Sequence, residues 1–228
     1  MKKISILIPV FNEYNSLLEL LNKVENIDFC GLQKEIILID DFSTDGTKDL
    51  YKQIPHKVLY HETNKGKGAA LRTGMKEATG DIIIIQDADL EYNPGDYIPL
   101  IKLILQNEAD VVYGSRLSNK NNKGKFLLLS YLANITLSFL TRILYKTSIT
   151  DMETCYKAFR APIIKDINIE SDRFDFEPEI TAKILKKGAR YKELPISYDA
   201  RKASEGKKIG WKDGIQAIWT LTKYRFFR

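Results

Sequence analysis

Cysteine and histidine are scarce in this sequence, with two of each among 228 residues. Two cysteines cannot form a disulfide scaffold in a chain of this length, so Cys30 and Cys155 indicate a reducing compartment. His56 and His61 lie around one predicted strand and are too few for a metal cluster. The scarcity therefore excludes a disulfide-rich secreted scaffold and assigns no role to either histidine.

Two common phosphate-binding motifs are also missing. The end of the first predicted strand reads Pro9-Val10-Phe11-Asn12-Glu13 rather than G-x-G-x-x-G, and no G-x-x-x-x-G-K-[ST] occurs in the sequence. These absences disfavour a nicotinamide dehydrogenase and a P-loop NTPase. Residues 1–12 are too short for a signal peptide with its cleavage site, and no repeat, low-complexity tract or linker divides the chain.

The composition is typical of one soluble globular domain with a sizeable core, since 44% of the residues are hydrophobic. The net charge of +5 is unevenly distributed. Residues 201–228 carry eight basic and two acidic side chains, a net of +6, so the other 200 residues sum to −1. A basic C-terminal stretch on a nearly neutral body could serve contact with nucleic acid or with a membrane, or have no partner at all.

Apolar β-branched runs alternate with helical patterns along the chain. We predict strands at 4–10, 35–40, 57–60, 81–86, 110–113 and 190–196, and helices at 17–24, 68–78, 94–106 and 175–187. The four consecutive isoleucines at 82–85 are typical of a strand that is buried on both faces. This alternation predicts an α/β fold with a mostly parallel central sheet flanked by helices.

Two C-terminal segments have an amphipathic pattern. Residues 126–145 are long enough to cross a bilayer, and 14 of these 20 residues are apolar. Their polar residues share one helical face, which favours an amphipathic helix over a membrane span, while a helix packed in the protein's own core is an equal alternative. These polar residues are Ser130, Asn134, Ser138 and Arg142. The second segment predicts a helix that could lie on an anionic surface, with Trp211, Ile215, Ile218, Trp219, Thr222 and Phe226 at helical spacing.

Carboxylates follow two of the predicted strands, at the edge where open parallel sheets bind ligands. Asp40 and Asp41 follow the second strand, and Asp87-Ala88-Asp89 follows the four isoleucines. Residues i and i+2 of an extended segment point the same way, so Asp87 and Asp89 can face one divalent cation, Mg²⁺ or Mn²⁺. The alternative is a strand-ending turn capped by aspartate. Residues 64–70 form a glycine- and lysine-rich helix start, where backbone N–H groups could approach an anion.

The ordered set of these stretches resembles the inverting glycosyltransferases of family 2. The closer resemblance is to the branch that includes dolichyl-phosphate mannose synthase and other polyprenyl-phosphate glycosyltransferases, and it covers nearly the whole chain. The matching stretches are 8–13, 40–47, 64–69, 87–89, 114–116, 151–157, and Arg201 with 205–207. The resemblance implies a GT-A fold, a Rossmann-like and mostly parallel sheet with C-terminal amphipathic helices. It implies one domain, with a nucleotide-sugar-binding half at 1–115 and an acceptor-binding half at 116–228.

The resemblance also implies roles for individual residues. The nucleotide sugar would contact Pro9, Phe11, Glu13, Ile39, Asp41, Lys67 and Asp87. The metal would be held by Asp87, Asp89 and Glu91, and the acceptor phosphate by Arg116, Arg201 and Lys207. The catalytic residues would be Asp89, Arg116 and Asp151. Asp151 begins a D-x-x-[ST] stretch, where it could orient a substrate, act as a base or simply form a turn. For Glu177 and Glu179, at a predicted helix start, functional and purely structural roles are equally open.

The implied reaction is metal-dependent, inverting transfer of a hexose from a nucleotide sugar of the GDP-mannose or UDP-glucose type to a dolichyl or undecaprenyl phosphate. A lipid monophosphate has a second pKa near 6, as phosphoserine does, so this reaction needs no strong general base. Transfer to a saccharide hydroxyl is the alternative, and it does need a base. A non-catalytic basic module is a third interpretation, but its four strand-end aspartates would repel nucleic acid, so we expect no nucleic-acid partner.

The resemblance implies a peripheral protein at the cytoplasmic membrane face. Many such relatives continue into transmembrane helices after the position that matches Phe227, whereas this sequence stops at Arg228. We therefore expect the short, peripheral form or the catalytic part of a longer protein, and the resemblance leaves room for a separate membrane-anchoring partner.

Overall fold

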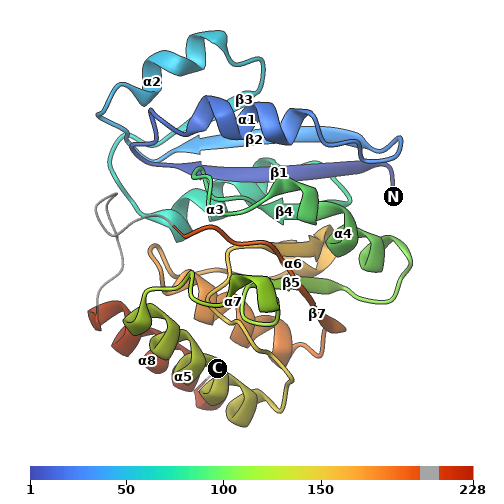
Figure 1. Ribbon diagram of the computed structural model, residues 1–228, viewed down its shortest axis with the longest axis vertical. Coiled ribbons are helices and arrows are strands. Elements are labelled where there is room, and N and C mark those ends of the chain that lie inside the picture. Colours follow the sequence, from blue (N-terminus) through green and yellow to red (C-terminus); the bar gives the residue numbers. More distant parts are fainter. Residues whose placement is uncertain (201–210, 228) are drawn as a thin grey trace.

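Strands and helices alternate along the computed structural model, which describes residues 1–200 and 211–227 (Figure 1). Seven strands lie within the described residues, and six of them match the predicted strands to within two residues at each end. They are β1 (Lys3–Val10), β2 (Gln33–Asp40), β3 (Lys57–Tyr60), β4 (Ile82–Ile85), β5 (Val111–Ser115), β6 (Lys157–Arg160) and β7 (Tyr191–Pro195).

The helices within the described residues include all those that the sequence pattern predicts. They are α1 (Leu17–Glu25), α2 (Thr47–Leu50), α3 (Lys67–Glu77), α4 (Tyr97–Leu105), α5 (Leu128–Tyr145), α6 (Ala161–Lys165), α7 (Phe176–Lys186) and α8 (Trp211–Phe226), with 3₁₀ turns at Tyr51–Gln53, Pro94–Asp96 and Lys120–Asn122. Pro94 begins the turn before α4, where a proline costs no helical hydrogen bond.

The seven strands form one sheet in the order β3-β2-β1-β4-β6-β5-β7. Parallel pairs join β1 to both β2 and β4, β2 to β3, and β5 to β7. The strand β6, which the sequence pattern does not predict, lies antiparallel between β4 and β5. Because it runs in the opposite direction, its first residue, Lys157, lies beside Ile85 at the carboxyl end of β4. The mostly parallel sheet is therefore confirmed, with one reversed strand that places a lysine at the carboxyl end of β4.

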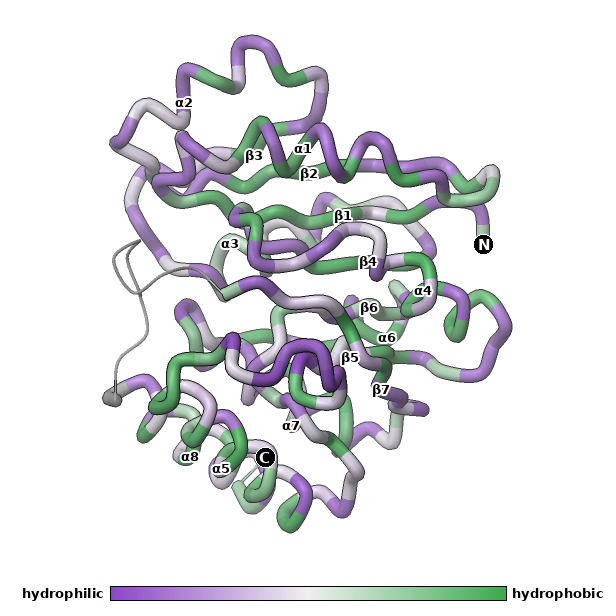
Figure 2. Tube along the Cα trace, in the orientation of Figure 1, coloured by the Kyte–Doolittle hydropathy of each residue, from purple (hydrophilic) through white to green (hydrophobic). Residues whose placement is uncertain are grey.

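Apolar side chains from the sheet pack against helices on both faces. In β4, Ile82 and Ile84 belong to the core under α1 and α4, whereas Ile83 and Ile85 belong to the core under α3, α6 and α7. All four isoleucines are fully buried. Figure 2 shows these hydrophobic stretches along the central strands. Burial on both faces explains why the strand lacks the alternation of a half-exposed sheet.

The helices α5 and α8 pack side by side at one end of the molecule (Figure 1), where Tyr145 donates a hydrogen bond to the Leu221 carbonyl. The side of α5 that faces the protein is polar, since Asn134 and Ser138 are buried. Its outer side is apolar and exposed. The exposed outer residues of the two helices are Leu128, Leu129, Leu132, Ile135, Phe139 and Ile143 of α5, with Ile215, Ile218, Trp219 and Phe226 of α8.

This orientation is the reverse of an ordinary surface helix, in which the apolar side faces inward. By length and composition, α5 is the one helix of the described residues that could cross a membrane, yet only 22% of it is buried in the protein. Its buried polar side chains form hydrogen bonds with the rest of the domain. The pattern of α5 therefore fits a helix that lies on the domain with an apolar side turned outward.

Candidate functional site

The carboxylates of Asp40 and Asp41, at the end of β2, bind other parts of the chain. Asp40 accepts hydrogen bonds from Ser43 N (3.0 Å) and the Tyr51 hydroxyl (2.7 Å). Asp41 lies 2.7 Å from His61 Nδ1 and accepts bonds from the backbone nitrogens of residues 65 and 66, at 2.9 and 2.6 Å. Asp41 is predicted to hold the nucleoside; in the structure both of its oxygens hold the loop that precedes α3. His61, to which the sequence assigns no role, is a partner in that contact.

The other predicted nucleotide-sugar residues differ in accessibility. Pro9, Phe11 and Glu13 are partly buried at the carboxyl end of β1. Glu13 Oε2 accepts a hydrogen bond from Ser16 Oγ (2.7 Å), and the same hydroxyl lies 3.0 Å from the carbonyl of Ala88. The side chain of Ile39 is fully buried in the core beside α3, so the contact predicted for this residue would have to be made through its backbone.

Lys67 joins Asp87 to residues that come from distant parts of the chain. Its ammonium lies 2.7 Å from Asp87 Oδ1 and 3.0 Å from Cys155 Sγ. It also lies 3.3 Å from Glu177 Oε1, an ion pair without hydrogen-bond geometry. Glu177 Oε2 accepts a hydrogen bond from the fully buried Lys157. Asp87, Lys67, Glu177 and Lys157 thus form a chain of alternating charge at the carboxyl end of β4, with the Cys155 thiol beside Lys67.

This chain fixes the protonation states of its members. Burial alone would lower the pKa of Lys67, but Asp87 and Glu177 raise that pKa well above its ordinary value. Burial would raise the pKa of Asp87, yet Lys67 holds it below the ordinary value. Burial also raises the pKa of the Cys155 thiol to about 12, so the thiol is neutral at pH 7. Lys67 and Asp87 are therefore an ion pair across the physiological range.

The residues predicted to bind the metal supply oxygen donors but not a ready-made cage. Asp89 Oδ1 accepts a hydrogen bond from Glu91 N (3.0 Å), and Glu91 Oε2 accepts one from the Tyr198 hydroxyl (3.1 Å). Among the described residues, no three carboxylate, histidine or cysteine side chains gather as a metal-binding group. The three-ligand set with Glu91 is thus not assembled. Asp87 and Asp89 still fit Mg²⁺ or Mn²⁺, because such ions need only one or two carboxylates when a diphosphate completes the shell.

Arg116 and Asp151 form a buried ion pair. Arg116 donates to Asp151 through its backbone nitrogen (2.8 Å), Nε (2.8 Å) and Nη2 (2.7 Å). Asn134 of α5 donates a fourth bond to Asp151 Oδ1, at 2.6 Å. Two carboxylate oxygens offer about four acceptor positions, so the acceptor positions of Asp151 are filled. Burial would raise the pKa of Asp151, but Arg116 and Asn134 keep it below the ordinary value. This geometry is suited to a carboxylate that positions Arg116, and it is not suited to Asp151 acting as a general base.

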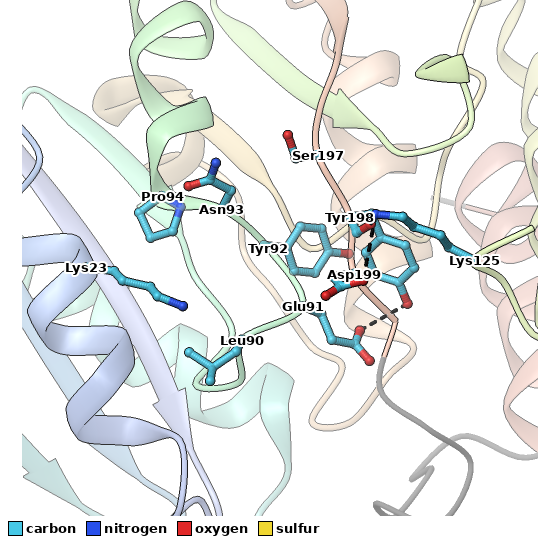
Figure 3. A pocket seen from close by; sticks show the side chains of 10 residues that line it. All are labelled: Lys23, Leu90, Glu91, Tyr92, Asn93, Pro94, Lys125, Ser197, Tyr198 and Asp199. Atoms are coloured by element: carbon cyan, nitrogen blue, oxygen red, sulfur yellow. Dashed lines mark hydrogen bonds and ion pairs between the residues drawn. The ribbon is translucent and has the colours of Figure 1, made fainter. Parts of the chain in front are cut away.

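Aromatic rings surround the Arg116 guanidinium. Its central carbon lies 5.3 Å from the centre of the Tyr198 ring and 6.0 Å from that of Tyr92, within the range of cation–π attraction. Glu91, Tyr92, Lys125, Tyr198 and Asp199 also line a pocket of about 230 Å³, which Figure 3 shows. The dashed line in Figure 3 between Glu91 and the Tyr198 hydroxyl marks the bond that ties the segment after Asp89 to residues 197–199.

Glu153 is a carboxyl group of the site that the sequence pattern does not single out. Its backbone nitrogen donates to Asn134 Oδ1 (3.3 Å), and its Oε1 is buried without a hydrogen-bond partner in the described part of the chain. Burial raises the pKa of Glu153 to about 7, and the neighbouring Glu177 adds to this rise. The group therefore titrates near neutral pH, in the range where acid–base chemistry operates.

The glycines before and within α3 have a structural role. A Cβ on Gly68 would lie 2.4 Å from the Ser171 carbonyl oxygen, and Ala69 N donates to the Asp172 carbonyl at 3.0 Å. Gly66 is equally close to residues 172 and 173. The predicted anion cradle of residues 64–70 is thus corrected in part, because these glycines admit the protein's own backbone and leave Lys67 as the group that points into the site.

The two glutamates of α7, Glu177 and Glu179, have different partners in the structure. Glu177 belongs to the Lys67–Asp87 chain, whereas Glu179 accepts hydrogen bonds from Glu170 N (2.8 Å) and Ser171 N (2.6 Å) and is structural. Arg201 and Lys207, predicted to bind the acceptor phosphate, lie outside the described residues. The sequence gives no role in the site to Lys157, a lysine in a short apolar run, or to Asn134, one of the polar residues that share a face of an apolar helix.

A comparison with known families decides the class of this protein. The sequence model of glycosyl transferase family 2 matches residues 5–167, which include the first six strands and most of the site. The chain belongs to glycosyltransferase family 2. It is therefore a glycosyltransferase, as the resemblance predicts.

Curated relatives of this family 2 enzyme include proteins named for polyprenyl-phosphate acceptors. The dolichol-phosphate mannosyltransferase of Pyrococcus furiosus is 29% identical over 97% of this chain and 64% of its own length. The undecaprenyl-phosphate mannosyltransferase of Micrococcus luteus is 26% identical, over 97% of this chain and 93% of its own length. An uncharacterized protein of Methanocaldococcus jannaschii is 29% identical over 99% of this chain and 93% of its own length.

Solved structures show the fold. A crystal structure of glucosyl-3-phosphoglycerate synthase from Mycobacterium tuberculosis superimposes with a TM-score of 0.78, at 18% identity, over 100% of this chain and 82% of the synthase. The same synthase was also crystallised with Mn²⁺, UDP and phosphoglyceric acid (TM-score 0.75, 16% identity, 100% and 80% of the two chains). The predicted GT-A fold is thereby confirmed.

Proposed function

We propose that this family 2 enzyme transfers a hexose from a GDP- or UDP-linked sugar to a polyprenyl phosphate, with inversion, at the cytoplasmic face of a membrane. The relatives named for dolichol phosphate and undecaprenyl phosphate support the acceptor class. The solved synthase with Mn²⁺ and UDP supports a divalent cation and a nucleotide donor. The residues of this chain supply the further argument.

One observation carries the proposal. The buried ion pair of Arg116 and Asp151 lies directly behind α5, a helix whose outer side is apolar. Arg116 is bound to Asp151, Asp151 is bound to Asn134 of α5, and the opposite side of α5 exposes Phe139 and Ile143. A guanidinium is suited to a phosphate, and an exposed apolar helix is suited to lipid. A lipid phosphate presents both groups in one molecule.

The reaction follows from these positions. Asp87 and Asp89 would hold the divalent cation, whose chemistry there is to stabilise the charge of the departing nucleotide diphosphate. Lys67 lies beside Asp87 and adds a positive charge next to that diphosphate. Arg116 would bind the acceptor phosphate and align one of its oxygens behind the anomeric carbon of the donor sugar. Attack by that oxygen would displace the nucleotide diphosphate and invert the anomeric configuration. No proton must be removed from a phosphate dianion, which is consistent with an Asp151 whose acceptor positions are filled.

A donor panel tests this function. Purified protein, Mg²⁺ or Mn²⁺ and a polyprenyl phosphate are incubated with GDP-mannose, UDP-glucose and related donors, and the lipid-linked sugar is measured. We expect product from at least one donor. Asp89→Asn should abolish it, whereas Asp81→Asn, at the opposite end of β4, should not. Product with a saccharide acceptor and none with polyprenyl phosphate would overturn the assignment.

Asp151→Asn separates the holder role from a base role. If Asp151 only positions Arg116, the variant should bind the acceptor more weakly. The KM for the acceptor should then rise, while turnover at saturating acceptor is retained. Loss of turnover at every acceptor concentration, with correct folding by circular dichroism, would instead indicate a base.

Transfer to a saccharide hydroxyl is the second candidate, and Glu153 is the observation that favours it. That reaction needs a base, and Glu153 combines a pKa of about 7 with a buried oxygen that has no hydrogen-bond partner among the described residues. With saccharide acceptors, Glu153→Gln should then abolish turnover. With a polyprenyl phosphate it should leave most of the activity.

A further inference from the structure

The inner face of α5 carries two polar side chains that hold three consecutive residues of the site. Asn134 Nδ2 donates to Asp151 Oδ1, and Asn134 Oδ1 accepts from Glu153 N. One turn along the helix, Ser138 Oγ accepts from Met152 N at 3.0 Å and donates to Asn134 Oδ1 at 3.3 Å. The helix thus binds residues 151, 152 and 153 through side chains that are linked to each other.

Asn134 shares its acceptor with the phosphate-binding candidate. Asp151 Oδ1 receives both Asn134 Nδ2, at 2.6 Å, and Arg116 Nη2, at 2.7 Å. Asn134 and Asp151 are buried, 5% and 0% exposed, so water cannot easily replace either bond. A shift of α5 therefore moves the carboxylate that fixes the guanidinium.

The same helix presents its apolar side outward. Leu132, Ile135 and Phe139 are exposed and lie within five residues of Asn134 on α5. A side chain that holds the site and side chains suited to lipid thus lie on the inner and outer sides of one helix. Because both sets of side chains belong to one helix, a displacement of α5 by contact on its outer side would also displace Asn134 on its inner side.

We propose that Asn134 is a positioning residue that ties the outward apolar helix to Arg116 and so sets the affinity for the acceptor phosphate. This inference rests on the proposed function, since it assumes that Arg116 receives a lipid phosphate. The acceptor class it specifies is an isoprenoid monophosphate whose chain lies along α5 while its phosphate reaches Arg116. Asn134 acts on the acceptor and has no part in binding the nucleotide sugar.

The isosteric Asn134→Asp variant tests the proposal. The introduced carboxylate would keep an oxygen for Glu153 N but would replace the amide that donates to Asp151, so the two carboxylates would repel each other. We expect the KM for geranyl phosphate, a short isoprenoid monophosphate, to rise about tenfold or more. Donor binding, measured by calorimetry with UDP or GDP and Mn²⁺, should stay within about twofold of wild type.

Thr141→Val is the matched control. Thr141 is buried on the same face of α5, but its hydroxyl donates to the Leu137 carbonyl of the helix itself. It should leave both acceptor KM and donor affinity unchanged. Asn134→Ala, which removes the donor without adding charge, serves if the aspartate variant does not fold, and it should also raise the acceptor KM.

The outcomes are distinguishable. If the wild type uses geranyl phosphate and both Asn134 variants have the wild-type KM for it, the positioning role of Asn134 is wrong. An equal loss of donor and acceptor affinity overturns it as well, because that pattern indicates general damage. A wild type that neither binds nor glycosylates geranyl phosphate or a long polyprenyl phosphate overturns the proposed function, and the inference with it.

Discussion

The ammonium group of Lys67 lies 2.7 Å from Asp87 Oδ1, so a protein cation already neutralises the carboxylate that would hold the metal. Lys67 also faces Glu177 at 3.3 Å, which gives it a second carboxylate to bind. A metal at Asp87 must compete with this ammonium. With a metal on Asp87, Lys67 would keep Glu177 as a carboxylate partner and could bind the phosphate oxygens of a diphosphate.

Replacing Lys67 should therefore strengthen metal binding by the free protein. In Lys67→Met, Asp87 and Glu177 lose their shared cation, and we expect Mn²⁺ to bind about tenfold more tightly in the absence of nucleotide. Nucleotide-sugar affinity should fall, because the diphosphate loses a positive neighbour. Calorimetry with Mn²⁺ alone and then with UDP or GDP measures both effects. Lys65→Met, an exposed lysine two residues earlier, is the control. Weaker Mn²⁺ binding in Lys67→Met would contradict the competition.

The sequence predicts the sheet well but not the strand that completes the site. The isoleucine run of β4 and the strand-end aspartates have strong local signals. β6 has only four residues and begins with Lys157, which has no apolar alternation to mark it. That lysine is buried because it finds Glu177 and the carbonyl of Thr154, partners that exist only after folding.

The inner face of α5 was equally hidden from sequence reasoning. The spacing of Asn134 and Ser138 correctly predicts a polar face, but polar faces ordinarily meet water. Here that face is buried because Asp151 and the backbone of residues 152 and 153 need hydrogen-bond partners. Pairing at long sequence distance decides which side of an amphipathic helix is inside, and no local pattern contains that information.

Glu153 should make the stability of the protein depend on pH. Its pKa is raised from 4.5 to about 7, so the folded state holds the proton more tightly than the unfolded state does. This contribution is fully present below pH 4.5 and is lost as the pH rises through 7. Glu153→Gln removes the cost of ionising a buried carboxyl, so it should raise the Tm at pH 8 by several degrees and change it little at pH 4.5. Melting curves at the two pH values measure this, and an equal shift at both would contradict the assignment.

Two helical glycines should respond oppositely to alanine. In Gly68→Ala the new methyl would meet the Ser171 carbonyl oxygen at 2.4 Å, so α3 must move and the protein should lose about 1–3 kcal/mol of stability. In Gly214→Ala no atom of residues 1–200 or 211–227 lies within 4 Å of the new methyl, so α8 should gain up to about 1 kcal/mol from helix propensity. Urea unfolding of both variants measures the difference. A stable Gly68→Ala variant would show that residues 171–173 can retreat from α3.

The outer side of α5 should bind lipid through its apolar side chains. Phe139 and Ile143 are 55% and 60% exposed and lie one turn apart. Phe139→Ser with Ile143→Ser should lower partition onto vesicles of anionic and zwitterionic lipid by about tenfold or more, because each side chain would lose part of the roughly 1.5–3 kcal/mol that its full burial contributes. Flotation of the protein with vesicles measures the loss.

Leu105→Ser is the matched control for this prediction, since Leu105 is an exposed leucine, 40% accessible, on α4. Its loss should leave partition unchanged. Salt then separates the two contributions to membrane binding. Raising the ionic strength should weaken attraction between anionic lipid and the exposed Arg142, Lys146 and Arg225, but it should not abolish binding that Phe139 and Ile143 support. If salt alone releases the wild-type protein completely, the apolar side of α5 does not enter the lipid and the basic side chains account for the attachment.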